Sequence, residues 1–184
     1  MTIFKPLRAL TVILFVLALA SVGALKADVP LSVKARNAHV IDVYERLARN
    51  SGQQDIPPLT ILESPIINAW TDGHDIVLTT GIMKIFENDD QLSMVLAHEM
   101  AHYMNHDIMH DDLDSATVEA HADKMGAFIM MRAGFDICKG KEIFMVFKRL
   151  FGDSTVPSDH PKNAYRYDQV NMPQCQGLSL TKGF

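Results

Sequence analysis

The sequence predicts a mainly helical α+β domain with a small sheet, and two observations lead to this fold class. Apolar residues recur at helical spacing over four stretches, near residues 40–48, 90–107, 115–132 and 141–151. Three short apolar runs, at 59–62, 66–70 and 75–80, are instead typical of strands. Asp72-Gly73 lies between the last two runs and favours a tight turn, so we expect a small antiparallel hairpin beside the helices.

The ends of these stretches are predicted from polar residues, glycine and proline. Residues 28–37 form a polar lead-in, and Ser51-Gly52 ends the first helix. A short helix at 82–87 precedes the central one. A last helix is expected from about Ser158 to Val170, with Pro161 in its first turn.

Length and charge limit the classes of protein to which the chain can belong. It has 184 residues, of which 48% are hydrophobic, and a formal net charge of -5. This is enough for one domain with a real core, which we assign to residues 28–184. The acidic balance and the lack of a basic patch or a Gly-rich phosphate loop argue against a nucleic-acid partner.

Residues 1–27 differ in kind from the rest. Two basic residues precede an apolar run at 9–25, and small residues follow it. This pattern predicts an export signal cut after Ala24 or Ala27. The alternative is an uncleaved anchor, since a run of this length is near the lower limit for crossing a bilayer and would give membrane association. In both cases we expect residues 28–184 to be exported, most simply to a periplasm.

The two cysteines, Cys138 and Cys175, fit an oxidising compartment. Paired, they would close a loop of 37 positions. The alternative is two buried free thiols. On the expected compartment we favour the disulfide.

The central helix carries the sequence His98-Glu99-Met100-Ala101-His102. Positions four apart on a helix lie only ~40° apart around its axis, so the two imidazoles can reach one ion. Glu99 is next to the first of them and can contact a metal-bound water without being a ligand. This is the H-E-x-x-H zinc signature. The helix is expected to continue to about Met109.

The following helix offers a third ligand. Glu119 and Asp123 are four positions apart and share a face with the small residues Gly126 and Ala127, which permit close helix contact. Glu119 would complete a site of two histidines and one glutamate with an open position for water. Asp123 would accept the far N–H of a ligand imidazole. The alternatives are a surface helix with two repelling acids, and a di-iron bundle, which would need a histidine at Ala122.

Four pieces of the chain together resemble the HtpX-like gluzincin peptidases, a group that includes the CAAX prenyl endopeptidases. They are the strand, turn and strand at 68–81, His98-Glu99-x-x-His102, Glu119-x-x-x-Asp123, and His160-Pro161 with Arg166 six positions after His160. The resemblance implies a zincin-like, thermolysin-like core with Glu119 as third ligand. It also implies that His160 and Arg166 line the cleft.

These patterns lead us to expect a zinc endopeptidase with one Zn²⁺ per chain. The resemblance implies that its substrates are misfolded or unassembled envelope proteins. Glu99 would act as general base, and His160 or Arg166 would help to hold the oxyanion. An extended peptide substrate would bind along the strand edge at Asp75–Leu78. The alternative function is a proteolytically silent zinc-binding chaperone or adaptor of the same fold.

Overall fold

The computed structural model of the chain describes residues 31–107, 115–152, 163–170 and 175. The expected signal or anchor at 1–27, and His160, lie outside these residues. The described helices are α1 (Leu31–Ser51), α2 (Asp89–Asn105), α3 (Ser115–Arg132), α4 (Ile137–Gly140), α5 (Glu142–Phe151) and α6 (Asn163–Gln169), with a 3-10 turn η1 (Ile82–Lys84). The strands are β1 (Leu59–Leu62), β2 (Ala69–Thr71) and β3 (Ile76–Thr79). The mainly helical α+β fold class is therefore confirmed.

The three strands form one mixed sheet with the order β1-β3-β2. β2 and β3 form the expected antiparallel hairpin, in which Trp70 pairs with Val77. β1 pairs with β3 in parallel, with Leu59 opposite Ile76. All four residues of β3 are buried, as expected for a strand with a neighbour on each side.

This strand order corrects the expected substrate edge. Residues 75–78 fall largely on β3, whose backbone is paired on both sides with β1 and β2. A peptide cannot add itself to a strand whose ladder is already complete. Among the described strands, the free edges belong to β1 and β2.

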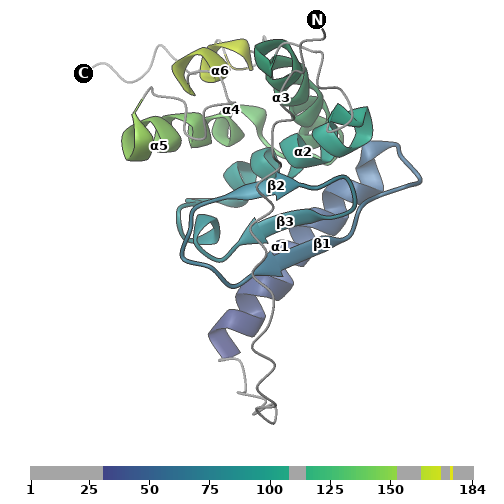
Figure 1. The fold of residues 1–184 in the computed structure, drawn as a ribbon, viewed down its shortest axis with the longest axis vertical. Coiled ribbons are helices and arrows are strands. Elements are labelled where there is room, and N and C mark those ends of the chain that lie inside the picture. The colour runs from purple at the N-terminus through teal and green to yellow at the C-terminus, as the bar shows by residue number, and fades with distance from the viewer. Residues whose placement is uncertain (1–30, 108–114, 153–162, 171–174, 176–184) are drawn as a thin grey trace, which may run out of the picture.

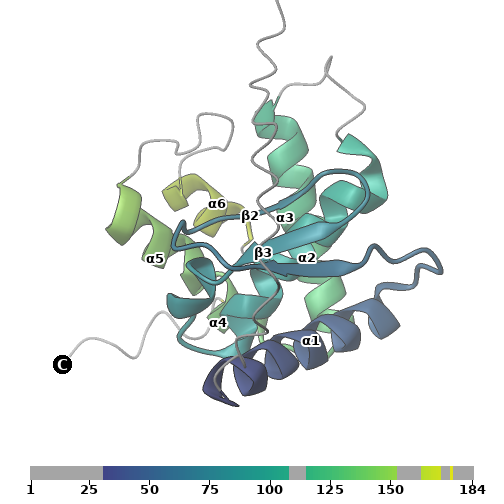
Figure 2. The ribbon, with the colours of Figure 1, turned by 60° about the horizontal axis from the view of Figure 1, so that its bottom comes forward.

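Helix α2 is the centre of the molecule. Figures 1 and 2 show α1 along one side of the sheet, with the remaining helices gathered on the other side of α2. α2 packs against α1, α3, α4 and α5 as well as β2 and β3. Every residue from Gln91 to Ala101 is buried as a result. The helix begins at Asn88, whose side chain accepts a hydrogen bond from the backbone N–H of Gln91.

Two helix limits differ from the sequence prediction, and one helix was not predicted. α1 begins at Leu31, so most of the expected polar lead-in is helical, with Arg36 and His39 exposed. α2 ends at Asn105 and not near Met109, because His106 adopts a left-handed conformation with φ 55° and ψ 35°. The short helix α4 was not expected. Its first turn is capped by the side chain of Asp136, which accepts two backbone hydrogen bonds.

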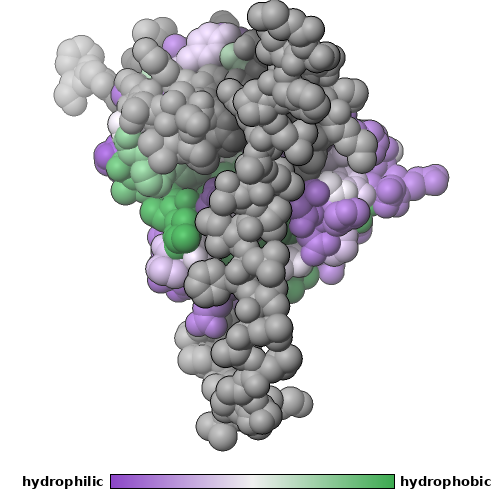
Figure 3. All heavy atoms as spheres, viewed as in Figure 1, coloured by the Kyte–Doolittle hydropathy of each residue, from purple (hydrophilic) through white to green (hydrophobic). Residues whose placement is uncertain are grey.

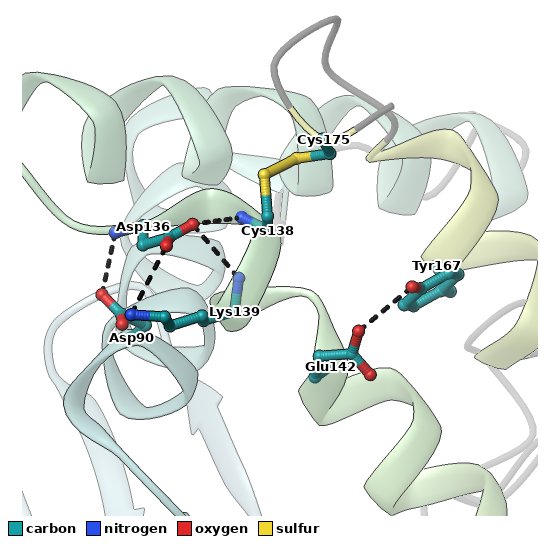
Figure 4. The surroundings of a disulfide bond; sticks show 7 residues. All are labelled: Asp90, Asp136, Cys138, Lys139, Glu142, Tyr167 and Cys175. Carbon is teal, nitrogen blue, oxygen red and sulfur yellow. Dashed lines mark hydrogen bonds and ion pairs between the residues drawn. A yellow bond between two sulfur atoms is a disulfide. The ribbon is translucent and has the colours of Figure 1, made fainter. Parts of the chain in front are cut away.

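The C-terminal helix α6 is fixed by α5 and by a disulfide. Tyr167 donates a hydrogen bond to Glu142 at 3.1 Å. The expected disulfide between Cys138 and Cys175 is present, with Cα atoms 5.3 Å apart (Figure 4). It joins α4 to the chain just beyond α6.

Some apolar side chains are exposed on the surface of the molecule. Apolar surface gathers over α5 and just below it (Figure 3). Leu150, on α5, is 49% exposed. Of the helices that the structure describes, none combines the length and the hydropathy needed for a bilayer span.

Candidate metal centre

Three side chains from two helices converge on one point. Nε2 of His98 and Nε2 of His102 are 3.0 Å apart. The carboxylate oxygens of Glu119 lie 3.4 Å from Nε2 of His98 and 3.2 Å from Nε2 of His102. His98 and Glu119 are buried, and the side chain of His102 is 12% exposed. All three side chains are therefore largely shielded from solvent, His102 the least.

Close contact between α2 and α3 makes this convergence possible. Gly126 on α3 lies so near α2 that a Cβ atom would come within 3.0 Å of the backbone nitrogen of His98. Ala127, the next residue, is completely buried. The expectation that small residues bring the two helices together is confirmed.

The donor set fits a zinc ion. Zn²⁺ binds imidazole nitrogen and carboxylate oxygen at about 2.0–2.2 Å in tetrahedral geometry, which separates the donor atoms by roughly 3.3–3.5 Å. The two imidazole nitrogens are 3.0 Å apart here, and each has a different carboxylate oxygen of Glu119 nearby, at 3.2 Å for His102 and 3.4 Å for His98. Two neutral imidazoles and one carboxylate are also the donors that a catalytic zinc uses, with a fourth position left for water. His98, His102 and Glu119 could thus hold one ion.

His98 is oriented from behind by Asp123. Its Nδ1 donates a hydrogen bond to Oδ1 of Asp123 at 2.9 Å, which leaves Nε2 directed at the other two donors. Asp123 is completely buried and accepts two further hydrogen bonds from Arg166, at 2.9 and 2.7 Å. The predicted supporting contact of Asp123 is therefore present.

Arg166 makes Asp123 a permanent anion. Burial alone would raise the pKa of Asp123, but the charge and hydrogen bonds of Arg166 outweigh it and lower that pKa to about 2. Burial likewise opposes the charge on Arg166, yet Asp123, Glu119 and Glu99 raise its pKa overall. The guanidinium also stacks on Phe144, 4.6 Å from the ring centre.

The carboxylates beside His98 favour positive charge at its ring. Burial and the charge of Arg166 both lower the pKa of His98, but hydrogen bonds to Asp123 and Glu119 prevail and raise it to about 10. A divalent ion would meet the same carboxylates, with the imidazole in the neutral form in which it binds metals.

Glu99 lies beside His98 on α2 and is 7% exposed. Its charge acts on Arg166, so its carboxylate is near the cluster although it is not one of the three converging donors. Three carboxylates, those of Asp123, Glu119 and Glu99, act on the guanidinium of Arg166, and a fourth, that of Asp107, contacts His102. In the described part of the chain, negative charge thus outweighs positive charge around the two imidazoles, which favours a divalent cation.

One supporting residue was missed by the sequence analysis. Nδ1 of His102 donates to Oδ2 of Asp107 at 2.8 Å. Asp107 lies five positions after His102, and residues at that spacing do not share a helix face, so the spacing does not predict this contact. The two side chains meet only because the helix ends before Asp107. Of the other histidines that the structure describes, His39, His74 and His121 are exposed and are not among the three converging donors. His106 is also exposed, at the end of α2.

Comparison with known proteins agrees with this geometry over part of the chain. Residues 34–114 match the model of Peptidase family M48, which supports a metallopeptidase. The match covers somewhat less than half of the sequence and contains His98, Glu99 and His102, whereas Glu119 lies beyond its end. No curated protein matches the chain significantly.

Proposed function

We propose that the chain is a zinc-dependent endopeptidase of the M48 type. The observation that carries the proposal is the convergence of Nε2 of His98, Nε2 of His102 and the carboxylate of Glu119 within 3.4 Å of one another. The family match over residues 34–114 supports the same activity independently, because it rests on sequence alone. We also propose that the chain is related to the HtpX-like and CAAX-type peptidases that its motifs resemble.

Each residue of the site has a separate role in the proposed reaction. His98, His102 and Glu119 would hold the zinc, which when bound supplies Lewis acidity that lowers the pKa of water toward about 7. Glu99 accepts the proton of the attacking water and then delivers it to the leaving amine. Asp123 keeps His98 in the tautomer whose Nε2 is free, and Arg166 keeps Asp123 charged.

Arg166 supports the site mainly as a positioning residue. It is 7% exposed, and its Nη2 lies 3.6 Å from Oε2 of Glu119 as well as 2.7 Å from Asp123. The resemblance implies a further role for Arg166 and His160 in holding the oxyanion of the substrate. That role stays a prediction.

We place the substrate along β2. This strand is an edge of the sheet and packs against α2, whereas β1 packs against α1. An extended peptide could add to β2 by backbone hydrogen bonds without a demand on its sequence, which suits unfolded or unassembled protein chains. Peptides N-methylated at alternate backbone amides test this, since strand addition requires those N–H groups and methylated peptides should not be cleaved.

The decisive experiment compares two variants in purified protein. Glu99→Gln should bind zinc with the parent affinity and lose cleavage of casein, since it removes the base and no ligand. Glu119→Ala should lose both zinc and cleavage. Glu45→Gln, an exposed change on α1, is the control that should alter neither. Undiminished casein cleavage by Glu99→Gln would reject the proposal, and so would zinc binding without cleavage in the parent protein.

We also propose that the mature chain is exported. The disulfide between Cys138 and Cys175 supports an oxidising compartment such as the periplasm. Mass measurement of the protein recovered from fractionated cells tests both alternatives for residues 1–27. A mass corresponding to a start after Ala24 or Ala27 indicates cleavage, and a full-length chain in the membrane fraction indicates an anchor.

A further inference from the structure

The end of helix α2 carries a feature that the proposed function does not use. His106 lies in the left-handed region, at φ 55°, and in the described part of the chain it is the one residue other than glycine with a positive φ. Its backbone N–H bonds to the carbonyl groups of His102 and Tyr103. Histidine occupies this conformation at a steric cost that glycine would not have. Such a residue often marks a functional constraint.

The consequence of this turn is the position of Asp107. On a continuous helix, a residue five positions after His102 would lie about 140° around the axis from it and could not reach its ring. Because the helix stops at Asn105 and the chain reverses at His106, Oδ2 of Asp107 comes to 2.8 Å from Nδ1 of His102. The side chain of Asp107 is 13% exposed, so water competes little for this contact.

We infer that Asp107 is the positioning residue of His102, and that the left-handed turn at His106 serves to deliver it. The inference rests on the proposed metal site and deepens it. Asp107 fixes the imidazole in the tautomer whose Nε2 faces the metal and increases the basicity of that nitrogen. Each ligand histidine then has its own carboxylate, Asp123 for His98 and Asp107 for His102.

The two supporting carboxylates differ in charge environment. Asp123 accepts two hydrogen bonds from the guanidinium of Arg166, which offsets its negative charge. Within the described part of the chain, the charged partner of Asp107 is His102 alone. The contact of Asp107 is therefore directed at one imidazole, and we expect it to contribute strongly to metal affinity.

The first test is zinc affinity, measured by competition with a chelating dye. Asp107→Asn should weaken zinc binding by about 10–100-fold, the usual cost of losing such a partner. It should also alter the visible spectrum of the cobalt(II)-substituted protein, which reports ligand geometry. The urea midpoint of the zinc-free protein should not change. Asp42→Asn, an exposed acid on α1, is the matched control and should change none of the three.

The second test separates the position of Asp107 from its charge. His106→Val keeps the charge but disfavours the left-handed turn, so it should weaken zinc binding as Asp107→Asn does. His106→Gly favours the turn and should keep the parent affinity. The double variant His106→Val, Asp107→Asn should be no weaker than Asp107→Asn alone, since both changes remove one contact.

Three outcomes would overturn the inference: parent zinc affinity in Asp107→Asn, parent affinity in His106→Val, or losses that multiply in the double variant. A parent protein that binds no zinc would instead reject the proposed function. A parent that binds zinc and cleaves casein, with Asp107→Asn of equal affinity, would reject this inference alone.

Discussion

Arg166 and Asp123 form a doubly hydrogen-bonded ion pair, although 43 positions separate them in the sequence. Nε of Arg166 donates to Oδ2 of Asp123 at 2.9 Å, and Nη2 donates to Oδ1 at 2.7 Å. Oδ1 also accepts the Nδ1 hydrogen of His98. The orientation of a metal ligand on α2 therefore depends on α6, near the end of the described chain.

Arg166→Ala should destabilise the fold strongly. It leaves Asp123 buried without its cation, and breaking a buried pair in this way costs about 3–5 kcal/mol. Urea unfolding of the zinc-free protein measures the change. Arg49→Ala is the matched control, because Arg49 forms an exposed i,i+4 pair with Glu45 and its loss should cost less than about 1 kcal/mol. Equal effects of the two substitutions would contradict the structural role of Arg166.

Substitutions at Gly126 should separate the two helices that form the site. A Cβ atom there would lie 3.0–3.2 Å from backbone atoms of Ala97 and His98, so α3 must shift. Gly126→Ala should cost about 1–3 kcal/mol and Gly126→Val more, as expected for overpacking. Zinc affinity should fall in the same order. Ala116→Val, an exposed change on the same helix, should leave zinc affinity unaltered. A Gly126→Val protein with parent affinity would refute the argument.

Tyr44 should make the protein sensitive to alkali. Its hydroxyl donates to the carbonyl of Pro57, and burial, with the charges of Tyr103 and Asp75, raises its pKa well above the ordinary value of 10.0. A raised pKa contributes stability that is complete below about pH 10 and is lost as pH rises further, with a slope of about 1.4 kcal/mol per pH unit.

Tyr44→Phe removes that slope and should be less stable at pH 8 by about 0.5–1.5 kcal/mol, through loss of the hydrogen bond. Denaturant unfolding at pH 8, 10 and 11 measures both effects. Tyr165→Phe, at an exposed tyrosine, should keep the slope of the parent. If the stability of Tyr44→Phe falls with pH as steeply as that of the parent, Tyr44 is not the group responsible.

The parts of the site that could be predicted from the sequence are those set by local helical geometry. His98 and His102, and Glu119 and Asp123, are pairs four positions apart, so each pair shares a helix face whatever the rest of the chain does. The small residue at Gly126 gave the further indication that the two faces meet. The Cys138–Cys175 disulfide was predicted from the compartment expected for an exported chain, and the structure contains it.

The parts that could not be predicted depend on a chain reversal or on non-local pairing. Asp107 was missed because the helix was expected to continue to Met109, which would have turned that carboxylate away from His102. The left-handed turn at His106 could not be predicted, because the residue at that position is not a glycine. The substrate edge was assigned wrongly because the parallel pairing of β1 with β3 joins two segments between which β2 lies in the sequence. That pairing makes β3 the central strand.

The disulfide should stabilise the fold and, through α6, the metal site. Cys138 and Cys175 enclose 37 positions, and closing a loop of that length is worth roughly 4 kcal/mol in the chain-entropy model. The loop includes α5 and α6, so the bond holds the segment that carries Arg166. Reduction should therefore lower both the urea midpoint and the zinc affinity of the parent protein.

The double variant Cys138→Ser, Cys175→Ser should reproduce the reduced parent, and dithiothreitol should have no effect on it. Zinc affinity in this variant should fall less than in Arg166→Ala, because the contacts of α6 with α5 remain, including the 3.1 Å hydrogen bond from Tyr167 to Glu142. Tyr167→Phe in the serine background removes that contact and should lower the affinity further. If zinc affinity is the same in all of these proteins, the disulfide contributes to global stability alone. The contact of Arg166 with Asp123, which orients His98, would then not depend on the disulfide.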